Sequence, residues 1–297
     1  MISIEDYENM FALFEAEQEL ISSLLNPNII TEGFNDKVTS YVNKVLQSTQ
    51  KSWDRFNKKV ATEKDKKFLD SNQKLLTSNN IRTFNAYDYT SYDLTLFNKL
   101  KVVPFNYDNM KDNLVSREKF LSAYYAGIID SNTKSVKKFI QEKIESKRFT
   151  LKCTATNVNT FYRFCKEGFF TTKKYIENDL SKLNNTANNI NNDINTIVSS
   201  QQEAKAFLES MIFEAPVMGV NFDKKNQQDS NMSTDKSGNT YFKALVLYMK
   251  ISTEIISTKM KMLSKIYYDY LYILNIASNV KGSGKSTEQQ KINQVKI

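Results

Sequence analysis

Residues 242–274 read FKALVLYMKISTEIISTKMKMLSKIYYDYLYIL, and mostly apolar side chains recur in this stretch at alternating spacings of four and three. The same rhythm runs through residues 176–211. Such spacing keeps one face of an α-helix against a partner over about five heptads, which a strand or a short helix does not need. We call these recurring positions the two seams. They are Ile176, Leu180, Leu183, Ala187, Ile190, Ile194, Ile197, Gln201, Ala204, Leu208 and Met211, then Phe242, Val246, Met249, Thr253, Ile256, Met260, Leu263, Tyr267, Tyr270 and Leu274.

The stretch between the two seams contains residues that end helices, among them Pro216, Gly219 and Gly238. A link of this kind lets two helices fold back on each other. We therefore predict an antiparallel helical hairpin from about residue 168 to 211 and from about 239 to 277. At 1.5 Å per residue, each arm would span roughly 50 Å.

The composition predicts a mainly α fold. The 297 residues are 40% hydrophobic and 12% aromatic, enough for a substantial core, while 7 Gly and 3 Pro are too few for the many turns of a β-sandwich. We expect an elongated helical bundle with a long antiparallel coiled-coil-like hairpin and a Tyr/Phe-rich irregular middle segment. The expected domains are N-terminal helices (1–80), an aromatic-rich mixed segment with short helices (81–166), the hairpin (167–280) and a flexible basic tail (281–297).

Amphipathic patterns predict two helices in the N-terminal region. The first runs from Ile4 to Leu25, and the second begins near Phe34 and continues toward Leu76. Trp53 lies at helical spacing among the apolar residues of the second helix. An interface anchor is one interpretation of this lone Trp, but we expect it to belong to the core.

Residues 81–113 lose the helical rhythm and interleave aromatic residues with Asn and Asp. A non-periodic segment of this length suits either a loop packed over a helical core or a surface that contacts a protein partner. The candidate partner interface comprises Phe84, Tyr87, Tyr89, Tyr92, Phe97 and Tyr107.

Basic residues outnumber acidic ones, 41 to 33, which gives a net charge of +8. Two shorter helices are expected at 116–130 and 133–147, followed by a short strand within 149–164. The second of these helices and its end carry the candidate phosphate contacts, which are Lys137, Lys138, Lys143, Lys147 and Arg148. Because Glu142 and Glu145 lie among them, a solvated helix face is the alternative interpretation.

No residue pattern in the chain points to catalysis, and we expect no catalytic residue, cofactor, metal or small-molecule substrate. The sequence has no His, which removes the usual general base and metal ligand. Cys153 and Cys165 match neither a CxxC pair nor a zinc motif, and we expect two reduced, buried thiols. Gly282–Thr287 reads GSGKST like the end of a P-loop, but Asn279 replaces the first Gly and no strand precedes it. The acidic start of the chain and the absence of a long apolar run predict neither a leader nor a membrane segment.

The segment Ile30–Phe34 (ITEGF), followed by NDKV and a Lys-rich amphipathic helix with WDRF at 53–56, resembles the N-terminal region of virion structural proteins of large tailed bacteriophages. Such proteins often carry an Ile/Leu-x-Glu site for the prohead protease. Ile30–Glu32, Leu13–Glu15 and Ile212–Glu214 have this form. The resemblance implies a non-enzymatic particle component, located in the virion and in host cytoplasm during assembly.

Three functions therefore remain open. The first is a virion protein of a capsid, tail or baseplate whose partners are other virion proteins or copies of itself. The second is a basic helical protein that associates with packaged or cytoplasmic nucleic acid, with DNA contacted independently of sequence. The third is a pore-forming helical toxin, which would require a secretion signal and an apolar membrane segment that the sequence does not display.

Overall fold

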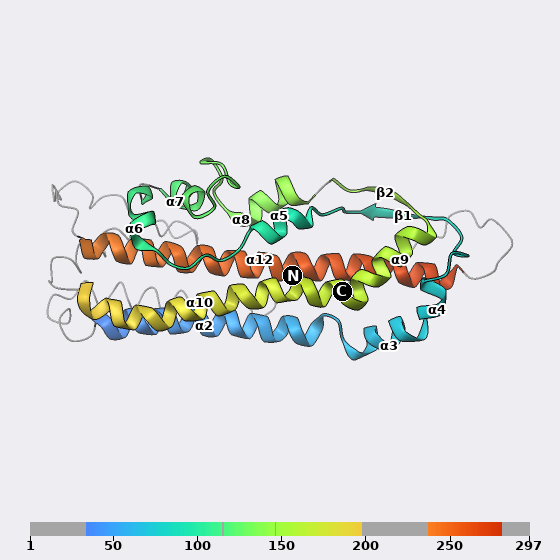
Figure 1. The fold of residues 1–297 in the computed structure, drawn as a ribbon, viewed down its shortest axis with the longest axis horizontal. Coiled ribbons are helices and arrows are strands. Elements are labelled where there is room, and N and C mark those ends of the chain that lie inside the picture. Colours follow the sequence, from blue (N-terminus) through green and yellow to red (C-terminus); the bar gives the residue numbers. More distant parts are fainter. Residues whose placement is uncertain (1–33, 115, 146, 198–236, 281–297) are drawn as a thin grey trace, which may run out of the picture. The chain divides into compact units, whose positions relative to one another are not determined.

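The computed structural model describes residues 34–114, 116–145, 147–197 and 237–280 (Figure 1). Within these residues the chain is mostly helical, with one two-stranded sheet, so the predicted mainly α class is confirmed. Several predicted features lie outside the described residues. These are the helix at Ile4–Leu25, the end of the first seam up to Met211, the three Ile/Leu-x-Glu tripeptides and the Gly282–Thr287 motif.

Contacts between residues divide the chain into two compact units, which do not follow the consecutive domains predicted from the sequence. Among the described residues, unit 1 combines 34–59, 92–145 and 172–263, with the gaps given above. Unit 2 combines 60–91, 147–171 and 264–280. Each unit is described by itself below.

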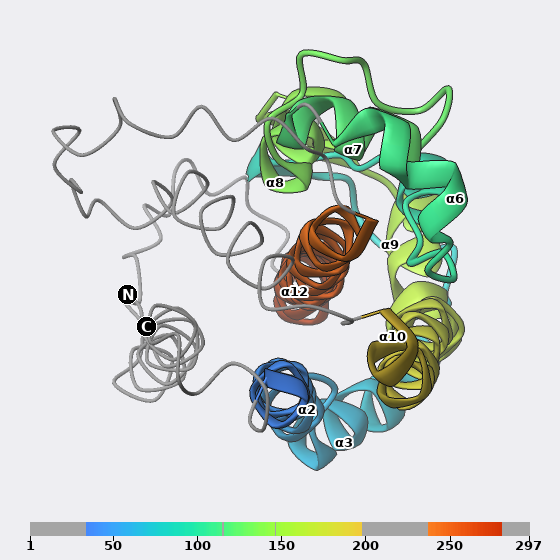
Figure 2. The same cartoon turned by 90° about the vertical axis from the view of Figure 1, so that its left-hand side faces the viewer.

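Long helices form the framework of unit 1. They are α2 (Phe34–Lys59), most of α10 (Phe169–Ile197) and the first part of α12 (Ser237–Asn279). Shorter elements are α5 (Leu94–Lys99), α6 (Tyr107–Met110), a 3₁₀ turn (Lys111–Asn113), α7 (Arg117–Tyr124), α8 (Val136–Phe139) and a π-helical turn (Ile140–Ile144). In this unit α12 lies between α2 and α10 on one side and α6 to α8 on the other (Figures 1 and 2).

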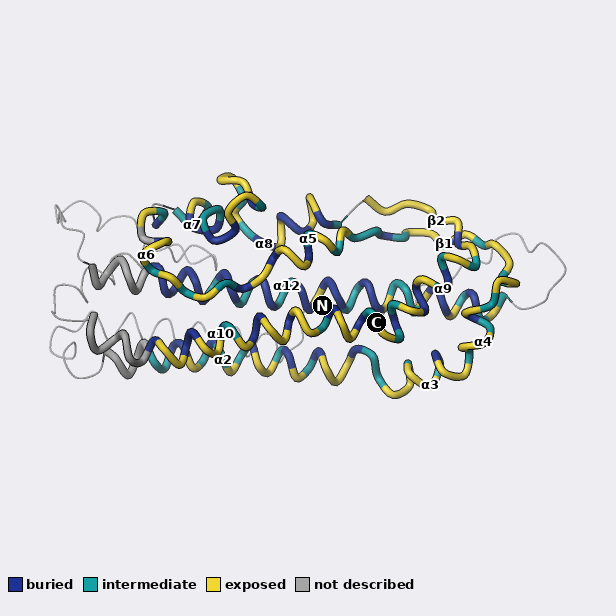
Figure 3. Tube along the Cα trace, viewed as in Figure 1, coloured by how far each residue is buried: buried dark blue, intermediate teal, exposed yellow. Residues whose placement is uncertain are grey.

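This central position explains the burial of α12, which exceeds the single face that its seam predicts (Figure 3). Every residue from Ala244 to Met249 is buried. A helix that is apolar on most sides is stable only where other elements cover those sides. On α10, by contrast, burial follows the seam, and the buried positions include Ile176, Leu180, Leu183, Ala187 and Ile190.

Hydrogen bonds join side chains of α10 and α12 in the described part of unit 1. Asp179 of α10 bonds Lys259 of α12, and Thr186 bonds Tyr248. The residue number of the α12 partner therefore decreases as the residue number on α10 increases.

The second predicted helix ends earlier than the sequence pattern suggests. α2 stops at Lys59, and Ala61 has a φ of 55°. A capping box then starts α3 (Glu63–Ser71), because the Thr62 side chain accepts from the Asp65 N–H while the Asp65 carboxylate accepts from the Thr62 N–H. A further short helix, α4, spans Gln73–Leu76, so a continuous helix to Leu76 is wrong.

Trp53 on α2 is a core residue, as its spacing predicts. Its side chain is only 8% exposed and stacks on Phe56 with ring centroids 5.3 Å apart. The Lys173 ammonium from α10 lies 5.2 Å from the Trp53 ring, a distance at which a cation is attracted to an aromatic face. These contacts favour a structural role for Trp53.

The sheet belongs to unit 2, where β1 (Phe84–Tyr89) pairs antiparallel with β2 (Phe149–Cys153). The predicted strand after residue 149 is therefore present, but β1 falls in a segment predicted to be irregular. α9 (Ala155–Arg163) and a π-helical turn (Phe164–Gly168) follow β2. Cys153 and Cys165 are buried free thiols, as predicted. Aromatic rings also pack against one another in this unit, for example Phe161 stacked on Tyr270 with ring centroids 4.3 Å apart.

Candidate functional site

The five candidate phosphate contacts do not form one cluster within a single unit. Lys137, Lys138 and Lys143 belong to unit 1, whereas Lys147 and Arg148 belong to unit 2, and all five side chains are exposed. In unit 1, the Lys138 ammonium lies 3.7 Å from the Glu142 carboxylate. For Lys137, Lys138 and Lys143, the mixed charges favour the alternative interpretation of a solvated helix face.

The candidate partner interface is also divided between the units. Phe84, Tyr87 and Tyr89 lie in unit 2, and Tyr92, Phe97 and Tyr107 lie in unit 1. Phe97 is fully buried, so its assignment to an exposed interface is wrong. The reason is that the Phe97 ring packs in the core 5.1 Å from the Lys259 ammonium. Tyr87 is the most exposed of the six, at 69%, and the other four are partly buried.

Polar side chains of α12 form hydrogen bonds with several other elements of unit 1, and the sequence analysis did not name these side chains as candidates. The Lys259 Nζ donates to the Asp179 Oδ2 at 2.7 Å, and each side chain is only 1% exposed. The backbone N–H of Val102 donates to the other Asp179 oxygen at 2.8 Å. One carboxylate therefore joins α10, α12 and the segment between α5 and α6.

Burial dominates the electrostatics of this ion pair. It raises the pKa of the Asp179 carboxyl and lowers the pKa of the Lys259 ammonium, and in each case the partner's charge opposes the effect. Removing two ions from water costs several kcal/mol, which a close contact and further hydrogen bonds offset. Such a pair adds little net stability, but losing one partner leaves a buried charge. The pair thus favours one alignment of α10 against α12.

A second group of polar side chains, which are hydroxyls, forms hydrogen bonds with the same segment at Val103. The Val103 N–H donates to the Tyr124 hydroxyl at 3.1 Å, and that hydroxyl shares a 3.1 Å hydrogen bond with Ser252. The Tyr248 hydroxyl donates to the Val103 carbonyl at 2.8 Å and lies 3.1 Å from the Thr186 hydroxyl. Burial raises the pKa of Tyr124 and of Tyr248, so both phenols stay protonated. Both backbone groups of Val103 are therefore satisfied by tyrosines.

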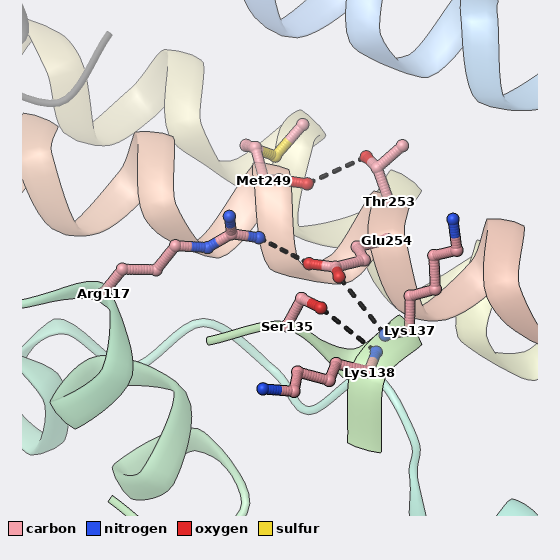
Figure 4. A network of polar contacts seen from close by, with 7 residues as sticks. All are labelled: Arg117, Ser135, Lys137, Lys138, Met249, Thr253 and Glu254. Atoms are coloured by element: carbon pink, nitrogen blue, oxygen red, sulfur yellow. Dashed lines mark hydrogen bonds and ion pairs between the residues drawn. The ribbon is translucent and has the colours of Figure 1, made fainter. Parts of the chain in front are cut away.

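Glu254 holds two of the short helices against α12 (Figure 4). One carboxylate oxygen accepts from the Arg117 guanidinium of α7 at 2.5 Å, and the other accepts from the Lys137 N–H in the first turn of α8 at 3.3 Å. Ser135, the N-cap of α8, accepts from the Lys138 N–H at 3.1 Å. A carboxylate near a helix N-terminus is favourable because unpaired amides gather there.

We call these three contacts, centred on Asp179, Val103 and Glu254, the α12 polar network. Its side chains bind one another or the backbone. Among the described residues, no group of three or more His, Cys, Asp or Glu side chains could hold a metal ion. None of the described helices combines the length and the apolar character that crossing a bilayer requires.

One sequence signal points to the buried ion pair. Asp179 and Lys259 directly precede the seam positions Leu180 and Met260, so opposite charges flank corresponding faces of the two helices. Their pairing could have been proposed from that pattern. The contacts to Val102, Val103 and Lys137 could not, because they depend on how the irregular segments fold back. No family model, curated protein or solved structure matches this chain.

Proposed function

We propose that this chain is a non-enzymatic structural component of a bacteriophage virion that acts through protein contacts. The identification with a phage particle rests on the resemblance carried by Ile30–Phe34 and the helix containing Trp53. We further propose that α10 and α12 are the arms of a long antiparallel hairpin. The Asp179–Lys259 and Thr186–Tyr248 contacts support this arrangement.

The observation that carries the proposal is that the α12 polar network joins short elements of unit 1 to its long helices. Its buried Asp179 holds Val102, Tyr124 bonds the partly buried Val103 N–H, and the partly exposed Glu254 holds α7 and α8 against α12. Buried hydrogen-bonded groups resist rearrangement because each broken contact leaves an unpaired group away from water. A rigid helical support suits a protein that must present fixed surfaces to neighbours in a particle.

Exposed aromatic side chains on α12 supply a surface for such neighbours. Tyr268 is 43% exposed and Tyr272 is 47% exposed, and a spacing of four residues places both on one face of the helix. Tyrosine is enriched in protein interfaces because it offers a large ring with a polar end. We propose this pair, rather than Phe97, as part of the protein contact surface.

Mass spectrometry of purified, nuclease-treated virions tests the proposal directly. We expect recovery of this chain at a fixed stoichiometry relative to the other particle proteins. Particles that lack the chain, while infected cells contain it free in the cytoplasm, would contradict the proposal.

Variants then test the contact surface. Tyr268→Ser combined with Tyr272→Ser should reduce incorporation into particles by about tenfold, because truncating an aromatic anchor typically costs more than about 1 kcal/mol. Tyr175→Ser is the matched control, since Tyr175 is 40% exposed but lies on α10. An equal loss with the control would reject Tyr268 and Tyr272 as the contact.

A further inference from the structure

The two strands of unit 2 form a ribbon with one buried and one solvent-facing side. Phe84 pairs with Cys153 and Ala86 with Leu151, and of these Ala86 and Cys153 are almost completely buried. Side chains alternate between the faces of a strand, so the residues between these positions point away from the core. The outward residues of the ribbon are Asn85 on β1 and Arg148, Thr150 and Lys152 on or next to β2, and all four are exposed.

An aromatic ring lies beside these polar residues. The register shifts between Ala86 and Tyr89, which marks a β-bulge, and Asp88 in the bulge has a φ of 56°. Asp tolerates this left-handed conformation better than most residues do. Tyr87 in the bulge is 69% exposed. Tyr87 and Asp88 lie opposite Thr150 of β2, so the bulge presents a tyrosine ring to solvent on the face that carries Thr150 and Lys152, with Arg148 one residue before the strand.

The charge of this part of the chain is strongly positive. Residues 147–171 contain five basic residues (Lys147, Arg148, Lys152, Arg163 and Lys166) and one acidic residue (Glu167). On the outward face itself, Arg148 and Lys152 are accompanied by one carboxylate, that of Asp88. Arg148 lies one residue before β2 and four positions before Lys152, and four extended residues span roughly 13 Å, so the two cations reach different anionic groups.

We propose that the outward face of the β1–β2 ribbon binds single-stranded nucleic acid, with Arg148 and Lys152 on phosphates and Tyr87 stacked on a base. Cations along a polar strand combined with an exposed ring match the two needs of such a ligand, a charged backbone and unstacked bases. A duplex offers phosphates but keeps its bases stacked, so it would not use the tyrosine. This binding goes beyond the proposed structural function and does not depend on it.

The test measures binding of a fluorescently labelled 20-nucleotide oligothymidylate to the full chain by anisotropy at several salt concentrations. Arg148→Glu combined with Lys152→Glu should weaken binding at least tenfold. Replacing Arg148 and Lys152 by Gln instead should reduce the slope of log affinity against log salt by about 1.4, because each phosphate contact with a single strand contributes about 0.7. Tyr87→Ala should weaken binding by about tenfold, since stacking on one base is worth roughly 1–3 kcal/mol. Tyr87→Phe should retain wild-type affinity.

Lys64→Glu combined with Lys67→Glu is the matched control, because both lysines are exposed on α3 of the same unit and the charge change is identical. This control should change affinity less than about threefold. Circular dichroism and thermal melting confirm that each variant is folded. Three results would overturn the proposal: no binding by the wild-type chain at low salt, an equal loss with the control, or duplex binding that equals single-strand binding and ignores Tyr87→Ala.

Discussion

The interiors of the two units differ in the polar groups that accompany their apolar side chains. Within the described residues, unit 1 buries a charged pair, Asp179 and Lys259, together with the hydroxyls that bond Val103. Unit 2 buries thiols and aromatic rings, represented by Cys153, Cys165 and Phe169. Directional bonds specify which residues face each other, whereas apolar packing tolerates changes that conserve volume. We infer that alignment is more strictly fixed in unit 1 than in unit 2.

The largest expected effect comes from breaking the buried ion pair. Lys259→Ala or Asp179→Ala should each lower the free energy of unfolding by about 3–5 kcal/mol, because the remaining charge is buried without its partner. Denaturation in urea, followed by circular dichroism, measures the change.

The double variant Asp179→Leu with Lys259→Met separates the charge from the packing. It should be more stable than either single variant, because no unpaired charge remains, although the Val102 N–H loses its acceptor. If the double variant loses as much free energy of unfolding as the two single variants combined, then the buried pair does not set the alignment of α10 against α12.

An intermediate effect is expected from the tyrosines around Val103. Tyr124→Phe should cost about 1–3 kcal/mol, because it removes the acceptor of the partly buried Val103 N–H and leaves the buried Ser252 hydroxyl without this contact. Tyr125→Phe is an internal control, since that buried hydroxyl has no hydrogen-bond partner in the described structure. The control should leave stability unchanged or slightly improved in the same urea titrations. Similar losses for both variants would mean that ring packing, not hydrogen bonding, holds the segment.

The sequence predicts the long helices of this comparison better than the contacts between them. The seams anticipate buried positions such as Leu183 and Leu263, because helical periodicity follows directly from which face meets a partner. β1 and the break at Ala61 were missed, since pairing with a strand some sixty residues away and a capping box override local pattern. Phe97 was misplaced for a related reason. Aromatic residues in a non-periodic segment do not reveal which of them faces the core.

The two buried thiols of unit 2 should make the free energy of unfolding depend on pH, with a smaller effect than the variants above. Burial raises the pKa of Cys153 to about 11 and raises that of Cys165 further. Unfolded thiols ionise near pH 8.5, so the stability from keeping them neutral is complete below that pH and is lost as pH rises toward the folded values. Between about pH 8 and about pH 9.5, we expect a loss on the order of 1 kcal/mol.

Urea titrations at the two pH values measure this loss. The variant Cys153→Ala with Cys165→Ala starts from a lower stability because of its cavities, but it should show a weaker decline with pH. If the decline is unchanged in this variant, the pH dependence belongs to other groups. Tyr267 and Tyr162 are candidates, because burial raises the pKa of each.

The smallest expected effect tests whether burial, rather than charge alone, distinguishes the Asp179–Lys259 pair. Lys138 and Glu142 form an ion pair in the same unit, but their side chains are 64% and 57% exposed. Water already solvates both groups, so Lys138→Met should change the free energy of unfolding by less than about 0.5 kcal/mol. The same substitution at Lys259 should cost several times more, because it strands the Asp179 carboxylate away from water. Parallel urea titrations of the two variants, at low and high salt, give the ratio directly. If both variants lose the same stability, and salt removes both losses, then solvent-screened attraction to carboxylates, and not the buried contact, accounts for the contribution of Lys259.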